Sequence, residues 1–177
     1  MNRNTLFAIA ACALLVFGSG SRAVAGVGQG AIGRGIVATE SGQIGEFQFK
    51  AHKAIGNIQG NEMIRVGGHA AFRTVLPDHA RVEINCKNVR HFVLGDDKRS
   101  AEFSGPAMLF VLTPRGVTRV AGVLAWRVVD RGRPGPNNPP DLAGVRFIPD
   151  DGSQEFNFGG AVVRGDVRVF EVTDTRP

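Results

Sequence analysis

Hydrophobic and polar residues alternate along most of this chain with a period of two, not with the spacing of three to four that marks a helix. In the run RVEINCK, residues 81–87, Val82, Ile84 and Cys86 alternate with charged and amide side chains. Because successive side chains of a strand point to opposite faces of a sheet, each such run predicts a strand with one buried face. The same alternation predicts that the Cys86 thiol is buried, with an intermolecular disulfide as the alternative.

About ten strands follow from these runs, separated by short segments rich in Gly, Pro, Asn and Asp. The expected ranges are 34–39, 44–52, 69–76, 81–87, 89–94, 99–104, 107–113, 117–129, 142–148 and 162–172, with a further short strand within 56–66. Many short strands with short connections indicate a single all-β domain, either an antiparallel sandwich or a meander barrel. Within the longest run, Gly122 predicts a bend or a bulge.

The first 25 residues have the three-part pattern of a secretory signal peptide. Arg3 precedes an apolar run at 6–17, and Ala23 and Ala25 provide a small-residue cleavage site. That run is too short to span a bilayer, which takes roughly 20 residues. Signal peptide 1–25 therefore precedes an all-β domain at 26–177, in which 26–33 is expected to be flexible. A lipid anchor at Cys12 is the alternative. We expect a secreted, periplasmic or envelope protein with no transmembrane segment after cleavage.

The charge balance is modest after that cleavage, because the loss of Arg3 and Arg22 leaves 19 basic against 16 acidic residues. This balance gives no indication of nucleic-acid binding. Arginines are nevertheless concentrated between residues 115 and 146, and the guanidinium fork suits phosphate and carboxylate groups. Arg127, Arg131 and Arg133 are therefore the predicted anion-binding residues, for an anionic glycan, a lipid headgroup or a wall polymer. The alternative is solvated arginines on outer strand faces.

The segment DRGRPGPNNPPDLAGVRF, residues 130–147, has four prolines and joins two predicted strands. Proline lacks an amide donor and has a fixed φ, which predicts a stiff connection outside the sheet. Asp130 is expected to accept hydrogen bonds from the amides that follow it and to fix the turn. Since Ca²⁺ prefers carboxylate and carbonyl oxygens, Asp130, Asn137 and Asp141 form a candidate calcium site.

Other motifs offer little chemistry. A G-x-G-x-x-G run at 28–33 is followed by a predicted strand, whereas a dinucleotide site needs a helix there. The four histidines lack a zinc-type spacing, and no serine lies in G-x-S-x-G. Glu46 and Glu102 are a conceivable carboxylate pair across a barrel mouth. With no Tyr, and with Trp126 in an apolar strand, stacking on sugars is not favoured. No catalytic or cofactor-binding residue is assigned.

Several short motifs occur in a characteristic order: GRGIV, GEFQFKA, RVEINCKNVRHFVLGDDKRSAEFSG, VLAWRVVDRGRPG and FGGAVVRGDVRVFE. In this order the chain resembles a family of exported bacterial β-domains, sometimes labelled post-COAP type, over most of 30–171. That family has no assigned activity, and its members often carry further Cys and aromatic residues. The resemblance implies a compact all-β fold and an extracellular or envelope location.

These observations favour an exported, non-catalytic β-domain with a structural or binding role. The alternative is a small β-barrel enzyme, or a metal-dependent ligand-binding protein, that uses the open end of a barrel. A pocket that brings Glu and His together would favour the alternative, and a filled interior would favour the binding or structural role.

Overall fold

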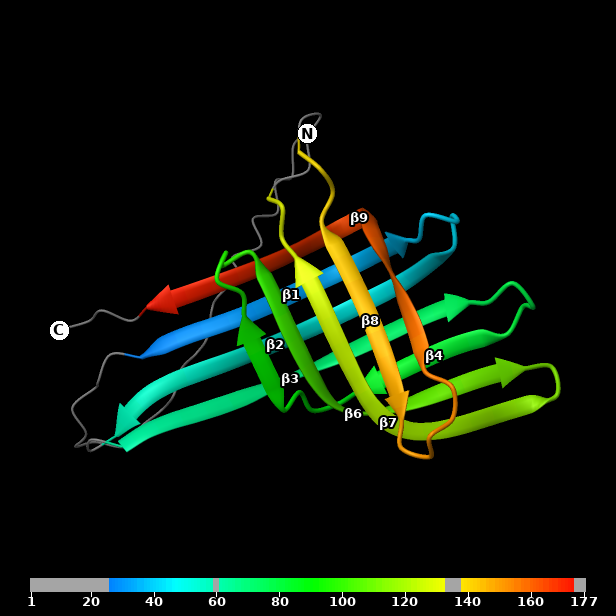
Figure 1. The fold of residues 1–177 in the computed structure, drawn as a ribbon, viewed down its shortest axis with the longest axis horizontal. Coiled ribbons are helices and arrows are strands. Elements are labelled where there is room, and N and C mark those ends of the chain that lie inside the picture. Colours follow the sequence, from blue (N-terminus) through cyan, green and yellow to red (C-terminus); the bar gives the residue numbers. More distant parts are fainter. Residues whose placement is uncertain (1–25, 59–60, 133–137, 174–177) are drawn as a thin grey trace, which may run out of the picture.

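The computed structural model describes residues 26–58, 61–132 and 138–173, which form nine β-strands. The strands are β1 (Val27–Ala38), β2 (Ile44–Ile58), β3 (Asn61–Val75), β4 (Arg81–Cys86), β5 (His91–Leu94), β6 (Ser100–Thr113), β7 (Gly116–Val129), β8 (Leu142–Pro149) and β9 (Phe156–Thr173). Every pairing is antiparallel, which confirms the predicted all-β class (Figure 1). Within these residues, no helix has the length and apolar character needed to cross a membrane.

The strands form one sheet in the order β4-β3-β2-β1-β9-β8-β7-β6-β5, and this sheet closes on itself in a ring. Closure comes from β4, which pairs with β3 through one side and with β6 through the other. The four-residue strand β5 pairs with the first part of β6, and β4 pairs with its second part. The result is a ring-like arrangement and not a regular barrel.

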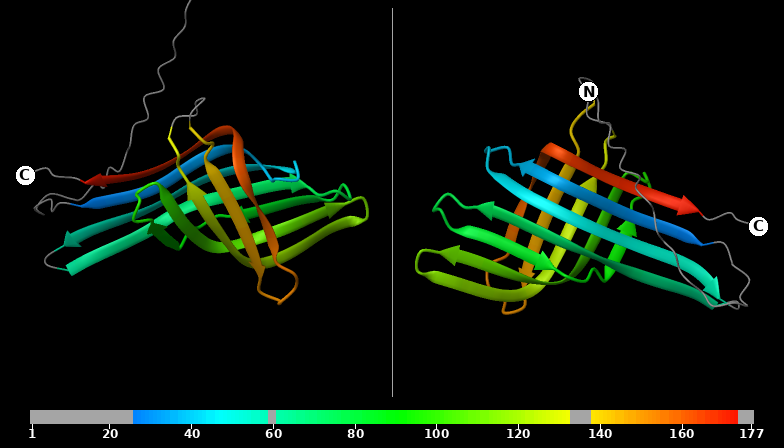
Figure 2. Two further views of the ribbon diagram at one scale, coloured as in Figure 1. Left: turned by 45° about the horizontal axis from the view of Figure 1, so that its top comes forward. Right: turned by 180° about the vertical axis from the view of Figure 1, so that it is seen from behind.

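Strands β6, β7 and β9 change direction along their length and divide the ring into two layers (Figures 1 and 2). β9 pairs with β8 up to Ala161 and with β1 from Ala161 onward. One layer contains β1, β2, β3 and the second part of β9, and the other contains β5, β8, the first part of β6 and the second part of β7. The strands of the two layers cross steeply, as in orthogonal packing, where strands that bend from one layer to the other form the corners.

An aromatic cluster fills the space between the layers. Trp126 of β7 is 3% exposed, and its ring lies 5.4–6.2 Å from those of Phe47, Phe49, Phe72 and Phe103. Such centroid distances are typical of packed aromatic pairs. The indole Nε1 of Trp126 finds no hydrogen-bond partner among the described residues. The interior is therefore packed and strongly apolar.

β7 changes direction beside the end of β8 (Figure 1), and Gly122, the predicted position of a bend or bulge, lies at that end of the β7–β8 ladder. Gly122 pairs with Ala107 of β6 and with Pro149 at the end of β8. A Cβ at Gly122 would lie 2.3 Å from the carbonyl oxygen of Ile148, so no larger residue fits without a backbone shift. The lack of a side chain allows the close approach that turns β6 and β7 away from β8.

The structure corrects two features of the predicted strand pattern. Residues 26–33 are not a flexible start, because strand β1 begins at Val27. This glycine-rich segment pairs with β2 on one side and β9 on the other, and these hydrogen bonds offset its poor intrinsic strand preference. The separate strands expected at 99–104 and 107–113 are one strand, β6, because Gly105 and Pro106 lie within a ladder that β7 continues.

Candidate functional site

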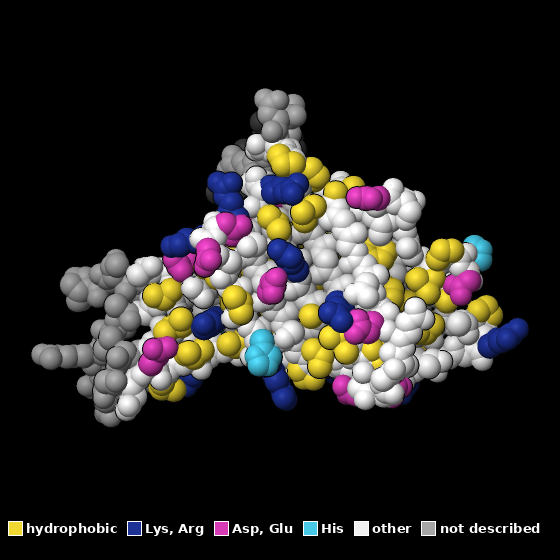
Figure 3. All heavy atoms as spheres, viewed as in Figure 1, with side chains coloured by type: hydrophobic (Ala, Val, Ile, Leu, Met, Phe, Trp, Pro, Cys, Tyr) yellow, Lys and Arg dark blue, Asp and Glu magenta, His cyan; other side chains and the backbone are white. Residues whose placement is uncertain are grey.

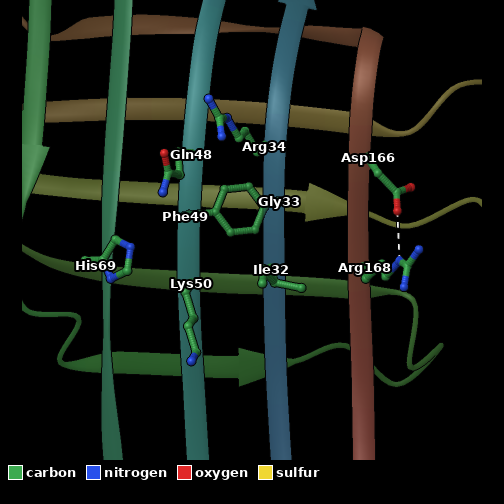
Figure 4. A pocket seen from close by; sticks show the side chains of 9 residues that line it. All are labelled: Ile32, Gly33, Arg34, Gln48, Phe49, Lys50, His69, Asp166 and Arg168. Atoms are coloured by element: carbon green, nitrogen blue, oxygen red, sulfur yellow. Dashed lines mark hydrogen bonds and ion pairs between the residues drawn. The ribbon is translucent and has the colours of Figure 1, made fainter. Parts of the chain in front are cut away.

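Two shallow depressions lie on the outer surface of the described structure. The larger, of about 380 Å³, lies on the outer face of the β9–β1–β2–β3 layer. Figure 4 shows its lining residues: Ile32, Gly33, Arg34, Gln48, Phe49, Lys50, His69, Asp166 and Arg168. Its floor is the Gly33–Phe49 pair of facing residues, whose side-chain positions point into the core. Its rim consists of outward side chains from four strands.

Strand register explains why these rim residues share one face. Arg168, Ile32, Lys50 and His69 are successive cross-strand neighbours on β9, β1, β2 and β3. Asp166, Arg34 and Gln48 form the adjacent row. Side chains two residues apart on a strand lie on the same face, so both rows point outward.

The whole outer face of this layer is basic; we call it the basic face. Among the described residues it carries six cationic side chains and two carboxylates. The cations are Arg34, Lys50, Arg65, Arg73, Arg164 and Arg168, and the carboxylates are Glu46 and Asp166. His52 and His69 lie on the same face. The layer is at the front in the right-hand view of Figure 2.

Most of these cations are not neutralised by neighbours. Arg73 pairs with Glu46, and the Arg168 guanidinium Nε lies 2.8 Å from Oδ2 of Asp166. Within the described residues, Arg34 and Lys50 make no ion pair and no side-chain hydrogen bond, and the same holds for Arg65 and Arg164. Fixed neighbouring cations without counter-charges create a positive potential that attracts anions.

The predicted anion-binding arginines lie elsewhere. Arg127 is on the outer face of β7, where its Nε lies 3.5 Å from Oε1 of Glu102 on β6. The Arg131 guanidinium donates to the Pro140 carbonyl oxygen at 3.4 Å. Arg133 lies outside the described residues. The structure therefore places Arg127 in an ion pair with Glu102 and Arg131 against a backbone carbonyl of the β7–β8 connection. Anion binding by these three residues stays a prediction.

The surroundings of Arg127, the outer surface of β5–β8, differ in charge from the basic face; we call this surface the mixed face. Arg146 of β8 makes two 2.8 Å hydrogen bonds to Glu155, and each partner shifts the pKa of the other. Hydrogen bonding to Arg146 lowers the pKa of Glu155 and raises that of the guanidinium. Cationic and anionic side chains are interspersed over this face (Figure 3).

The predicted calcium ligands hold the fold together through backbone amides. Asp141, 4% exposed, accepts hydrogen bonds from the amides of Arg131 at 2.8 Å and Val167 at 3.0 Å. Asp130 accepts from Gly132 at 2.8 Å, as its expected turn-fixing role requires, and from Val169 at 3.1 Å. Both aspartates thus tie the β7–β8 connection to β9, where β9 no longer pairs with β8.

Calcium binding at this connection stays a prediction, because Asn137 lies outside the described residues. Each oxygen of the Asp130 and Asp141 carboxylates already accepts one amide hydrogen bond. Within 26–58, 61–132 and 138–173, no three His, Cys, Asp or Glu side chains gather closely enough to hold a metal ion.

A smaller depression of about 180 Å³ lies on the mixed face and brings His91, Glu102 and Ser104 together. Nucleophilic catalysis needs the serine hydroxyl within hydrogen-bond reach of the histidine, and the histidine oriented by a third group. In the described structure no hydrogen bond joins these three side chains to one another. Glu102 instead forms an ion pair with Arg127. Glu46 lies on the opposite layer and does not meet Glu102.

Cys86 occupies the buried position that the alternation predicted. It is 3% exposed, and burial raises the pKa of its thiol, which a hydrogen bond from the Asn88 backbone only partly offsets. A buried, protonated thiol is a poor nucleophile.

The basic face was missed by reasoning from the sequence, which searched for charge concentrated along the chain. Its cations occur at widely separated positions between 34 and 168, one or two to a strand. The available signal was weak: the strands at 44–58 and 61–75 carry four Lys or Arg side chains against two Glu. Only the strand order brings these side chains together.

Comparisons with protein-family models, with curated proteins and with solved structures found no match for this chain.

Proposed function

We propose that this protein is an exported, non-catalytic binding domain that attaches to an anionic ligand of the bacterial envelope or its surroundings through the basic face. The observation that carries the proposal is the set of unpaired cations on one face, of which Arg34, Lys50 and Arg65 are clear examples. The signal-peptide pattern of residues 1–25 and the resemblance to exported β-domains support the location.

The packed interior supports a binding role over an enzymatic one. Enzyme sites are usually concave pockets of several hundred cubic ångströms that enclose most of a ligand. Here the interior between the layers is occupied by Trp126 and surrounding phenylalanines, and both depressions are open and shallow. A surface of fixed cations suits a partner that is itself extended and offers repeated anionic groups.

The proposal is tested by the salt concentration that elutes the purified mature domain from immobilised dextran sulfate. The test variant is the triple substitution Arg34→Ser, Lys50→Ser and Arg65→Ser on the basic face. The matched control is Arg119→Ser, Arg127→Ser and Arg146→Ser on the mixed face, which removes the same number of charges. We expect the test variant to elute at much lower salt than the wild type, and the control to elute close to it.

Equal shifts for the two triple variants would mean that retention follows net charge, and the basic face would lose its role. Failure of the wild type to bind the polyanion at low salt would overturn the proposed function. A third triple variant combines Arg127→Ser, Arg131→Ser and Arg133→Ser. If it eluted at lower salt than the basic-face variant, the anion-binding site would lie at the β7–β8 connection and not on the basic face.

A further inference from the structure

Apolar side chains lie beside the cations of the basic face. Ile32 is 44% exposed, Phe170 43% and Val172 57%. Exposed apolar residues also occur on the mixed face, where Val123 of β7 faces Ile148 of β8. On the basic face Phe170 and Val172 lie on the same side of β9, and Ile32 of β1 faces Arg168, two residues before Phe170 on β9.

The register places Phe170 in the row directly next to the row of Arg168 and Lys50. The basic row is Arg168, Ile32, Lys50 and His69, and the next row is Phe170, Gly30, His52 and Gly67. In the third row Val172 faces Gly28 of β1. Gly28 and Gly30 add no side chains between β9 and β2, so Phe170 and Val172 are not hidden by neighbours.

Gly30 leaves room for the Phe170 ring. A Cβ at Gly30 would lie 2.5 Å from the Phe170 ring, which shows that the ring lies over the β1 backbone. An aromatic ring over a glycine on a neighbouring strand is a known stabilising arrangement in sheets. The ring therefore presents an apolar surface to solvent at a fixed position, next to Arg168.

We propose that the basic face docks on the surface of a bilayer that contains anionic phospholipid. The inference rests on the proposed function and specifies its ligand. Lipid phosphates would meet Arg34, Lys50 and Arg168 around the larger depression, while Phe170, Val172 and Ile32 enter the boundary between headgroups and acyl chains. Membrane-surface segments combine the same two features, cations for headgroups and apolar side chains for the acyl boundary.

A soluble polyanion would contact only the cations of this surface. It would neutralise the cations but leave the exposed parts of Phe170, Val172 and Ile32 in water. Burial of these side chains is favourable in proportion to the apolar area removed from water. The position of Phe170, Val172 and Ile32 beside the cations thus favours a lipid surface over a charged polymer.

The test is co-sedimentation of the mature domain with vesicles of phosphatidylcholine, with or without one quarter phosphatidylglycerol. We expect binding to the anionic vesicles and little to the neutral ones. Val172→Ser and, separately, Phe170→Ser should each weaken vesicle binding about tenfold, because each loses apolar burial worth roughly 1.4 kcal/mol. Val93→Ser is the matched control, since Val93 is 62% exposed on β5 of the mixed face.

A fluorescent variant gives a second readout that does not depend on loss of binding. Trp126 is the only tryptophan and is buried, so Phe170→Trp adds one reporter on the basic face. We expect its emission to shift to the blue with anionic vesicles and not with dextran sulfate. Circular dichroism of each variant checks that the fold is retained.

Different failures of the two proposals can be told apart. If the domain binds dextran sulfate but the apolar variants sediment with vesicles as the wild type does, the lipid inference is overturned and the proposed function stands. If it binds neither the polymer nor the vesicles, both are overturned. Equal loss from Val93→Ser and Val172→Ser would also contradict the inference.

Discussion

The two outer faces of this ring differ in how their charges are compensated. On the mixed face, Arg127 and Arg146 each have a glutamate partner, Glu102 and Glu155, from a neighbouring strand or turn. On the basic face, Arg34 and Lys50 have no partner among the described residues. Both faces are built from antiparallel strands with outward polar positions, so the difference lies in side-chain identity and not in architecture.

This contrast shows that local charge along the chain is a poor guide to charge on the surface. In the arginine-rich stretch between 115 and 146, Arg127 and Arg146 are compensated by glutamates outside it, which strand pairing or a turn brings close. The basic face shows the converse, since its cations come from four strands that no sequence window contains together. Potential at a surface depends on neighbours in space.

The largest effect is expected from breaking the connection between the two layers. Asp141→Ala removes a buried carboxylate and leaves the amides of Arg131 and Val167 without their acceptor. We expect a loss of about 3 kcal/mol in the free energy of unfolding, because hydrogen bonds to charged groups are individually strong and the amides remain buried. Urea denaturation followed by circular dichroism measures it.

Asp150→Ala is the control for that substitution, since Asp150 is exposed in the turn that follows β8. It should change the free energy of unfolding by less than about 0.5 kcal/mol. If Asp141→Ala were no more destabilising than Asp150→Ala, the aspartate would not be a structural link between the layers.

An intermediate effect is expected from making the mixed face resemble the basic one. Glu102→Gln with Glu155→Gln frees Arg127 and Arg146 from their partners. We expect binding to immobilised dextran sulfate to become several-fold tighter, because each exposed cation near an anionic surface contributes about 1 kcal/mol. The elution salt concentration measures the change.

A control with the same change in net charge is Glu40→Gln with Glu62→Gln, where neither glutamate forms an ion pair in the described structure. Its gain should be smaller. Equal gains from the two double variants would show that ion pairing does not mask Arg127 and Arg146, and the contrast between the faces would lose its basis.

The smallest effect concerns a polar contact between the layers. Lys98, in the turn between β5 and β6, donates to Glu171 of β9 at 2.7 Å, and Gln29 of β1 donates to the same carboxylate at 3.0 Å. The hydrogen bond from Lys98, and next that from Gln29, lowers the pKa of Glu171 below its ordinary value of 4.5. Glu171 therefore stabilises the fold above pH 4.5, and this contribution is lost as the pH falls through the lowered pKa.

Glu171→Gln should accordingly lower the melting temperature slightly at pH 7, and the wild-type and variant curves should converge in acid. Melting temperatures between pH 7 and pH 2.5 test this, with Lys98→Met as the reciprocal variant. A constant difference across this range would show that the carboxylate charge does not contribute.

Alternation of polar and apolar residues was sufficient to predict the class and most strands of this fold. In β4, for example, Val82, Ile84 and Cys86 are buried as the pattern requires. The pattern failed where pairing partners outweigh local preference, as at the glycines of β1 and at Gly105–Pro106 in β6. The site was not predictable, because the depression depends on strand order and register, which periodicity does not specify.

The hydrogen bonds made by Asp130 and Asp141 have a further consequence for how copies of this protein behave together. After Ala161, β9 has a strand partner on one side only, and such an unpaired strand is a template for addition of a strand from another molecule. There the amides of Val167 and Val169 donate to the carboxylates of Asp141 and Asp130 and are not free to pair with another strand. Strand β4 is paired on both sides, with β3 and β6. The fold thereby limits the positions at which intermolecular sheets, and the fibrils that grow from them, can begin.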